Sequence, residues 1–235
     1  EVPAVHGDYC ARRVLTTSFV EGLEIDPFLG GEPGQAARDR IGAALFEFYL
    51  GSLFRHQLYN CDPHPGNYLF HGGGRVTFLD FGLVKHFTDA EMTTFQTMVR
   101  SAAVDHDVET FRATLEDAGM LRPGAPVGTA DVGRYFEHFY EPVRFDREMT
   151  WTGEYASRIV RHTFDRSSPI SQYATVPKAF VFIQRINLGL YALLGELGST
   201  GNYRRIAEEM WPFVDGPAST PLGELEHGWL DVRHR

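Results

Sequence analysis

The chain has 235 residues, of which 43% are hydrophobic, a composition that predicts a folded protein with a substantial core rather than a disordered one. Its 22 lysines and arginines against 31 aspartates and glutamates give a net charge of −9, which disfavours non-specific binding to nucleic acid but still permits a phosphate site bridged by a metal ion. The two cysteines, Cys10 and Cys61, are too few for a disulfide scaffold, so we expect both to be reduced.

No segment is predicted to cross a membrane. The longest apolar runs, residues 41–54 and 186–195, are shorter than the roughly 20 residues that span a bilayer. The chain starts at Glu1 without a signal-like segment, and we expect it to be a trimmed fragment of a longer protein.

The first predicted elements are a strand and a long helix. Residues 13–20 are rich in β-branched and aromatic side chains, which is typical of a strand. After a loop rich in proline and glycine, residues 35–59 carry two apolar stripes at a spacing of four. This pattern predicts a helix that is buried on most of its circumference.

A rigid loop and a hairpin are predicted next. Two prolines and a glycine within residues 61–67 exclude a helix there. Two short β runs, residues 68–70 and 75–79, are joined by residues 71–74, and this arrangement predicts a hairpin. The second run leads directly into the Asp-Phe-Gly triplet at 80–82.

The rest of the chain is predicted to be helical, because capping residues and apolar periodicity recur along it. The predicted elements are a helix that Thr88 and Glu91 cap from about residue 89, a helix that Asp105 caps and Gly119 ends, helices over 130–149 and 154–164, a long apolar helix opened by Thr175 and Pro177 and ended near Gly198, a short helix over 203–211, and a loop-rich tail from Pro212.

Three polar residues around the hairpin predict a site for phosphoryl transfer. Asp62 and Asn67 are five positions apart on the rigid loop, which is the spacing of Asp and Asn in a kinase catalytic loop. A hairpin returns the chain to its starting point, so Asp80 is expected to lie beside them. We assign Asp62 as the base or orienting group, and Asn67 and Asp80 as ligands of Mg²⁺ on bound ATP or ADP.

The predicted first strand fits the same scheme. Residues 14–22 resemble the kinase strand that runs into the hinge, where backbone groups bind adenine. By that alignment Thr17 is the gatekeeper, and Ser18 and Val20 supply the backbone contacts to the nucleotide.

The motifs together resemble one known family. Residues 61–67 (CDPHPGN), followed by residues 79–82 (LDFG), are similar to the motifs of the UbiB-type atypical kinases, also called aarF-domain-containing kinases. Residues 185–190 (RINLGL) and 202–206 (NYRRI) also resemble the C-terminal helices of that family. The resemblance implies a kinase-like fold, binding of Mg-ATP, ATPase-type activity, and a role in isoprenoid quinone or lipid metabolism at a membrane surface. We expect a cytoplasmic location, with peripheral attachment to a membrane in the full-length form.

The chain also departs from the kinase pattern. Asn60 stands where the family has a histidine two residues before the catalytic aspartate, so the bracing of the Asp-Phe-Gly turn is expected to differ. Only residues 83–87 separate this triplet from the next helix cap, and no Ala-Pro-Glu motif follows, which argues against a protein substrate.

We therefore expect a mainly α protein with a small β-hairpin, the C-terminal lobe of a protein-kinase-like fold. No glycine-rich loop or paired lysine precedes the hinge, so most of the N-lobe is expected to lie outside this chain, which alone would bind nucleotide weakly and turn over little. The predicted parts are residues 1–24 as the end of an N-lobe strand and the hinge, 25–211 as the helical C-lobe, and 212–235 as a loop-rich tail.

Two other functions remain open. Small-molecule phosphotransferases of the aminoglycoside or choline kinase kind share a similar loop, although they usually carry His-Gly-Asp where this chain has Asn60-Cys61-Asp62. A nucleotide-binding pseudokinase that recruits lipid or a partner protein is the third possibility. The sequence leaves the substrate and the oligomeric state open.

Overall fold

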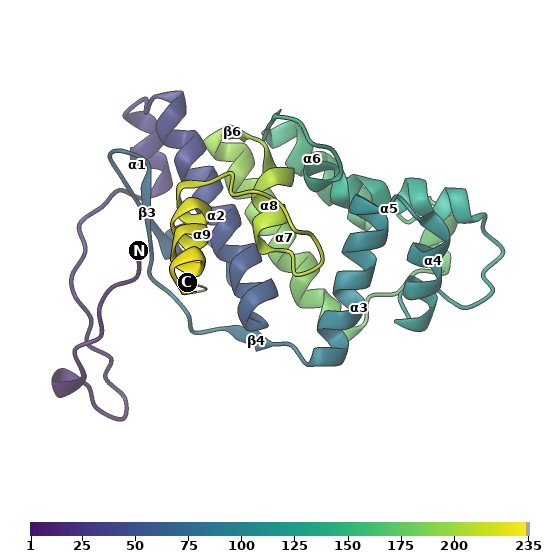
Figure 1. The fold of residues 1–235 in the computed structure, drawn as a ribbon, viewed down its shortest axis with the longest axis horizontal. Helices are drawn as coiled ribbons and strands as arrows, with labels where there is room; N and C mark the ends of the chain where they lie inside the picture. Colours follow the sequence, from purple (N-terminus) through teal and green to yellow (C-terminus); the bar gives the residue numbers. More distant parts are fainter. Residues whose placement is uncertain (234–235) are drawn as a thin grey trace.

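The long helix α2 (Gln35–His56) is the axis of the fold. In the computed structural model, which describes residues 1–233, it packs against α8, α7 and the hairpin (Figure 1). Its apolar stripes are buried as predicted, with Ile41, Leu45 and Tyr49 fully enclosed. The helix ends at His56, three residues earlier than predicted, because Gln57 takes a left-handed conformation and β1 begins directly after it.

The other helices surround α2 or extend from it as a second layer (Figure 1). They are α1 (Ile25–Gly30), α3 (Asp89–Val99), a π-helical turn (Arg100–Val104), α4 (Val108–Asp117), α5 (Thr129–Arg144), α6 (Gly153–Phe164), α7 (Lys178–Leu197), α8 (Tyr203–Met210) and α9 (Pro221–Arg233), with 3-10 turns at Gly7–Tyr9, Pro65–Asn67 and Pro169–Gln172.

Three two-stranded antiparallel sheets complete the described structure. β2 (Tyr68–His71) pairs with β3 (Arg75–Phe78), which confirms the predicted hairpin. β1 (Leu58–Asn60), which precedes the hairpin in the sequence, pairs with β4 (Val84–His86), which follows it. β5 (Met149–Thr150) pairs with β6 (Thr200–Gly201). The β1–β4 pair places the start of the 61–67 loop beside the segment that follows residues 80–82.

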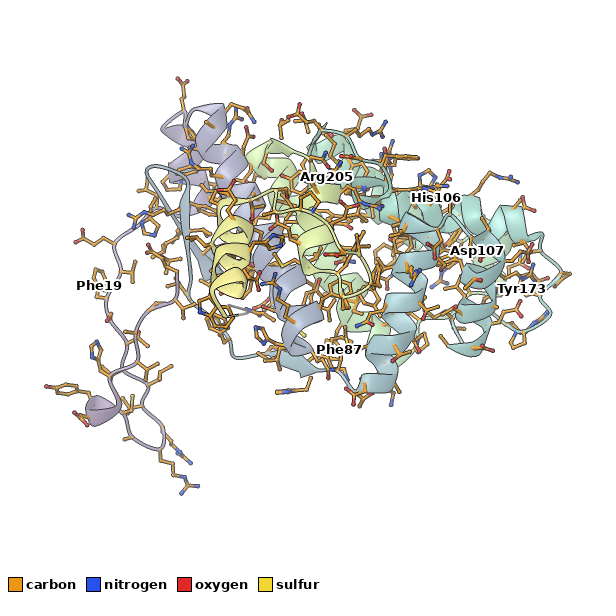
Figure 2. All side chains as sticks on the ribbon, in the orientation of Figure 1. Phe19, Phe87, His106, Asp107, Tyr173 and Arg205 are labelled. Carbon is orange, nitrogen blue, oxygen red and sulfur yellow. The ribbon has the colours of Figure 1, made fainter. Side chains whose placement is uncertain are left out.

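Residues 1–24 form an extended arm outside the helical layers, with Phe19 90% exposed on it (Figures 1 and 2). The predicted strand over residues 13–20 is not a regular strand. Isolated bridges join Val5 to Thr17 and Ala11 to Val14, so residues 13–20 pair within the arm, whereas Leu23, which follows them, bridges to Phe70 of β2.

The predicted cap at Asp105 is wrong by two residues. The chain continues from α3 through the π-helical turn, which Asp105 closes by donating its backbone N–H to the Arg100 carbonyl (2.9 Å). After His106, at a φ of 52°, the Asp107 carboxylate accepts from the N–H of Thr110 (3.1 Å) and caps α4 (Figure 2). The Thr110 hydroxyl also donates to the Asp107 carboxylate (2.6 Å), and this bond, together with the one from the Thr110 N–H, lowers the pKa of Asp107.

The tail beyond residue 212 also differs from the prediction, because α9 forms where a loop was expected. Pro221 occupies the first helical position, which needs no backbone N–H, and the Thr220 hydroxyl accepts from the N–H of Gly223 (3.0 Å). An ion pair between Arg55 and Glu226 (2.5 Å) ties α9 to α2. A proline-rich segment is therefore compatible with a helix when the proline is at its start.

One helix in the described part of the chain, α7, has a segment, Phe180–Leu197, that is long and apolar enough to span a bilayer by length and composition. In this fold it is a core helix, because Ile186 and Leu194 are fully buried and α6 and α2 pack along it. The helix ends at Gly198, as predicted, and this glycine takes a left-handed conformation.

The capping box of α3 gives a direct test of the fold. The Thr88 hydroxyl accepts from the N–H of Glu91 (3.2 Å), and the Glu91 carboxylate accepts from the N–H of Thr88 (2.8 Å). We expect Thr88→Ala to lower the free energy of unfolding by about 1 kcal/mol, measured by urea denaturation, because an N-terminal N–H loses its partner. Thr93→Ala changes an exposed residue in the middle of the same helix and should leave the free energy of unfolding nearly unchanged. Equal losses in both variants would contradict this role for the cap.

Candidate phosphate and metal site

The loop at residues 61–67 is held in one conformation by its own backbone and side chains. The Nδ1 atom of His64 accepts from the N–H of Gly66 (3.0 Å), and the N–H of Asn67 donates to the His64 carbonyl (2.9 Å). These two bonds close the 3-10 turn that carries Asn67. His64 therefore has a structural role in the loop.

Asn60 connects the two halves of the site. Its Nδ2 atom donates to the backbone carbonyl of Asp80 (2.8 Å), and its Oδ1 atom accepts from the N–H of Asp62 (3.2 Å). The residue is 6% exposed, so both bonds are shielded from water. A single buried amide therefore joins the 61–67 loop to the turn at 80–82. Asn60, which stands where the family has a histidine, therefore braces the Asp-Phe-Gly turn.

The three predicted site residues lie in this hydrogen-bonded region. The Nδ2 atom of Asn67 donates to the carbonyl (3.0 Å) and to Oδ2 (3.2 Å) of Asp62, which leaves its Oδ1 atom available as a ligand. The Oδ1 atom of Asp80 accepts from the N–H of Gly82 (2.7 Å), and Asp80 is exposed. The N–H of Leu79 donates to the Asn67 carbonyl (2.9 Å), so the strand that delivers Asp80 is bonded to the loop.

Helix α7 supports the loop from the other side, a function that the sequence did not reveal. A Cβ atom added to Gly189 would lie 2.3 Å from Cγ of Pro63, so the buried proline rests directly on the helix backbone. On the same helix, Arg185 lies 3.9 Å from Asp62, and Asn187 accepts a hydrogen bond from the Tyr59 hydroxyl (3.1 Å). The sequence marked residues 185–190 only by their resemblance to a family. In the structure, three of these residues hold the 61–67 loop and the tyrosine next to it.

Tyrosines form the floor beneath the loop. The hydroxyls of Tyr49 and Tyr68 are 2.5 Å apart, and the rings of Tyr49 and Tyr59 meet edge to face at 5.7 Å. Burial raises the pKa of Tyr49 to about 12, so this pair stays neutral and hydrogen-bonded at physiological pH. Cys61, next to this floor, and Cys10 are both free thiols, as expected.

The structure does not bring the predicted adenine contacts to this site. Thr17, Ser18 and Val20 lie on the extended arm, and no described hydrogen bond joins them to residues 61–67. The N–H of Ser18 donates to the Ala4 carbonyl (2.8 Å), so this donor is already occupied by the arm itself.

The donor set suits a hard cation. Carboxylate oxygens of Asp62 and Asp80 and the amide oxygen of Asn67 are the ligands that Mg²⁺ prefers, and Mg²⁺ commonly keeps waters and phosphate oxygens as its other ligands. Within residues 1–233 no group of three or more His, Cys, Asp or Glu side chains is placed to hold a metal by protein ligands alone. The site therefore fits a metal carried in with phosphates, not an all-protein zinc site.

Comparison with solved structures gives the class of fold. A solved structure of Rv3197 in complex with erythromycin, from Mycobacterium tuberculosis, matches with a TM-score of 0.70 at 21% identity, over 89% of this chain and 52% of that one. This similarity shows a shared fold, and the fold class is kinase-like. The mainly helical content with a small hairpin agrees with the prediction.

Sequence comparison finds relatives for the first half of the chain. Residues 1–115 match the model of the ABC1 atypical kinase-like domain. The Arabidopsis thaliana protein ACTIVITY OF BC1 COMPLEX KINASE 8, chloroplastic, is 34% identical over 86 residues, 36% of this chain and 11% of that protein. AarF domain-containing protein kinase 1 of Mus musculus is 32% identical over 94 residues, 38% of this chain and 18% of that protein.

Residues 1–115 are thus similar to the ABC1 atypical kinase-like domain, and the names of these relatives confirm the predicted aarF resemblance. The matched segments cover less than a fifth of either curated relative.

The contact of Pro63 with α7 can be tested by replacing two glycines. Gly189→Ala should destabilise the protein by about 1–3 kcal/mol, because the new methyl group overlaps Pro63 and forces the loop away from the helix. Gly153→Ala, at the start of α6 with open space around it, should leave the protein as stable or slightly more stable. Urea denaturation of both variants measures the difference. Equal stability of the two would show that the loop does not depend on this contact.

Proposed function

We propose that this chain is the C-terminal lobe of an Mg-ATP-binding atypical kinase or ATPase of the UbiB type. The observation that carries the proposal is the buried Asn60 amide, which donates to the Asp80 carbonyl and accepts from the Asp62 N–H. It lies at the loop and turn where a kinase places its catalytic and metal-binding aspartates.

The proposed roles follow from which atoms remain free. Asp62, with its side chain 39% exposed, orients the attacking hydroxyl or water and accepts its proton. The free Oδ1 atom of Asn67 and the free Oδ2 atom of Asp80 hold the Mg²⁺ that accompanies the nucleotide. The metal supplies positive charge to the phosphates during transfer.

The segment after Asp80 supports a substrate that is not a protein. In an ordinary protein kinase this segment forms a long platform for the substrate. Here residues 84–86 pair at once with β1, and α3 starts at Asp89. We propose water, a small molecule or a lipid as the acceptor, and a role in isoprenoid quinone or lipid metabolism, in keeping with the family. A small-molecule phosphotransferase would use the same residues.

The test is nucleotide binding and turnover by the intact gene product. We expect Asp80→Asn to reduce Mg-dependent binding of ATP and ADP by at least tenfold, because a metal ligand loses its charge. We expect Asp62→Asn to keep binding but to lower turnover by about 10²- to 10⁴-fold, since the general base is removed. Calorimetry and phosphate release measure the two effects.

The matched control is Asp117→Asn, which removes an exposed carboxylate at the end of α4, and it should change neither quantity. Binding without turnover by the unaltered protein would favour the pseudokinase instead. Nucleotide binding that is insensitive to both Asp62 and Asp80 would overturn the proposed site.

A further inference from the structure

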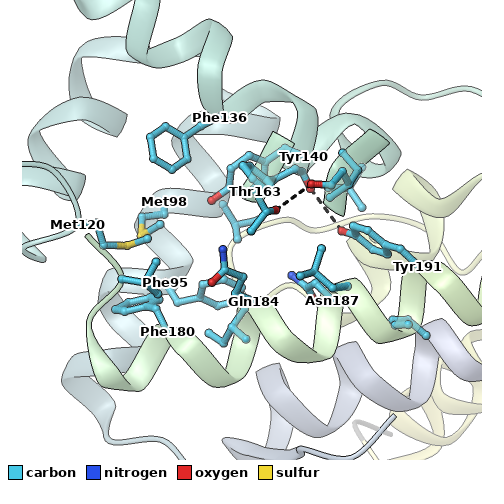
Figure 3. Close-up of a pocket in the computed structure, with 18 of the residues that line it drawn as sticks. Phe95, Met98, Met120, Phe136, Tyr140, Thr163, Phe180, Gln184, Asn187 and Tyr191 are labelled. Carbon is cyan, nitrogen blue, oxygen red and sulfur yellow. Dashed lines mark hydrogen bonds between the residues drawn. The ribbon is translucent and has the colours of Figure 1, made fainter. Parts of the chain in front are cut away.

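A cavity of about 380 Å³ lies among helices α2, α3, α5, α6 and α7 (Figure 3). Its walls are mostly aromatic and aliphatic, with Phe95, Met98, Phe136 and Phe180 among them. Binding sites for small organic molecules typically have volumes of roughly 300–1,000 Å³, so the cavity is large enough for such a ligand. Spaces of this size are rare in closely packed protein interiors.

Several polar groups point into this apolar space. Gln184, Asn187 and Tyr191 lie on one face of α7 and reach toward Thr163 and Tyr140 (Figure 3). The Tyr191 hydroxyl donates to the carbonyl of Phe139 (3.3 Å), and Asn187 accepts from Tyr59 (3.1 Å).

Two of these groups have no protein partner. Within the 233 described residues, the Gln184 amide and the Tyr140 hydroxyl make no hydrogen bond. Both side chains are partly exposed, so their polar groups are open to the cavity, and a ligand with a matching oxygen or N–H group would find a hydrogen-bond partner there.

The interior of the cavity is electrically neutral. Burial raises the pKa of Tyr140 and of Tyr191 far above the physiological range, so both phenols keep their protons. Asp165 and Arg166 are the charged residues among the described lining, and both are exposed. A charged ligand would lose its hydration with no opposite charge to meet it inside.

The entrance lies between the end of α6 and the start of α7. Phe164 and Val176 are 70% and 41% exposed there, beside Asp165 and Arg166. Apolar side chains exposed at the mouth of an apolar cavity favour the entry of an apolar molecule.

We propose that this cavity binds a neutral, largely apolar organic molecule whose ring or chain carries a carbonyl or hydroxyl oxygen. The Gln184 amide and the Tyr140 hydroxyl bond that oxygen, and the aromatic walls enclose the rest. The site is separate from the candidate phosphate site, because Arg185 and Gly189 of α7 contact the 61–67 loop, whereas Gln184 and Tyr191 line the cavity.

A matched series of fluorescent tricyclic probes tests the proposal on the intact gene product. 9-Phenanthrol carries one hydroxyl, phenanthrene carries none, and phenanthrene-9-carboxylate carries a charge. We expect saturable binding of 9-phenanthrol at one site, about 2- to 10-fold tighter than phenanthrene, because one hydrogen bond is added. The carboxylate should bind at least tenfold more weakly than 9-phenanthrol. Saturating Mg-ADP should displace none of the probes.

Two variants locate the probe. Gln184→Leu keeps the volume and removes the amide, so it should abolish the preference for 9-phenanthrol over phenanthrene. Ala174→Leu fills part of the cavity and should weaken the binding of 9-phenanthrol and of phenanthrene at least fivefold. Ala130→Leu, on the exposed surface of α5, is the control and should change neither affinity. The melting temperature of each variant verifies folding.

The proposal is overturned by any of three results. These are saturable binding of the carboxylate as tight as that of 9-phenanthrol, displacement of 9-phenanthrol by Mg-ADP, and unchanged affinity for both probes in a folded Ala174→Leu variant. Absence of saturable 9-phenanthrol binding to the unaltered protein also overturns it.

Discussion

The contact on which the candidate site depends is the seat of Pro63 on the backbone of α7 at Gly189. Any side chain at that position would collide with the proline ring. The contact therefore joins the loop that follows β1 to a helix far along the chain, and it puts Asp62 within reach of Arg185. Because a loop of seven residues has little core of its own, its geometry exists only once the helical layers have assembled around α7.

Helix α7 therefore belongs to two sites at once. Arg185 and Gly189 contact the 61–67 loop, Gln184 and Tyr191 line the cavity, and Asn187 takes part in both. Through Tyr59, Asn187 connects the cavity wall to the tyrosine floor beneath the loop.

The features that were predicted correctly have local causes. The capping box at Thr88 and the helix end at Gly198 are each determined by a few neighbouring residues, and so is the hairpin. The spacing of Asp62 and Asn67, with Asp80 delivered by the hairpin, likewise predicted which residues lie together.

The errors share a different cause, since they depend on contacts between distant parts of the chain. Residues 13–20 have strand composition but find no sheet to join, and the tail helix is ordered against α2 through Arg55. The Asn60 amide could be recognised as a brace only when its two partners, 62 and 80, were seen on either side of it. The contacts of Arg185, Asn187 and Gly189 with the loop and its floor required the tertiary fold for the same reason.

Charge around the loop explains why the proposed nucleotide site needs a divalent cation. Asp62 and Asp80 put two carboxylates where phosphates would bind, on a chain that is already acidic. Arg185 offsets this weakly, because its pair with Asp62 is long, at 3.9 Å, and its side chain is 62% exposed.

Lys85, in the strand after the Asp80 turn, is committed elsewhere, because it pairs with Glu91 at 3.1 Å. In the described part of the chain the compensating charge for bound phosphates is therefore small. A nucleotide without its metal would be repelled by Asp62 and Asp80, whereas the same nucleotide carrying Mg²⁺ would gain Asp80 as a ligand and bring less negative charge toward Asp62.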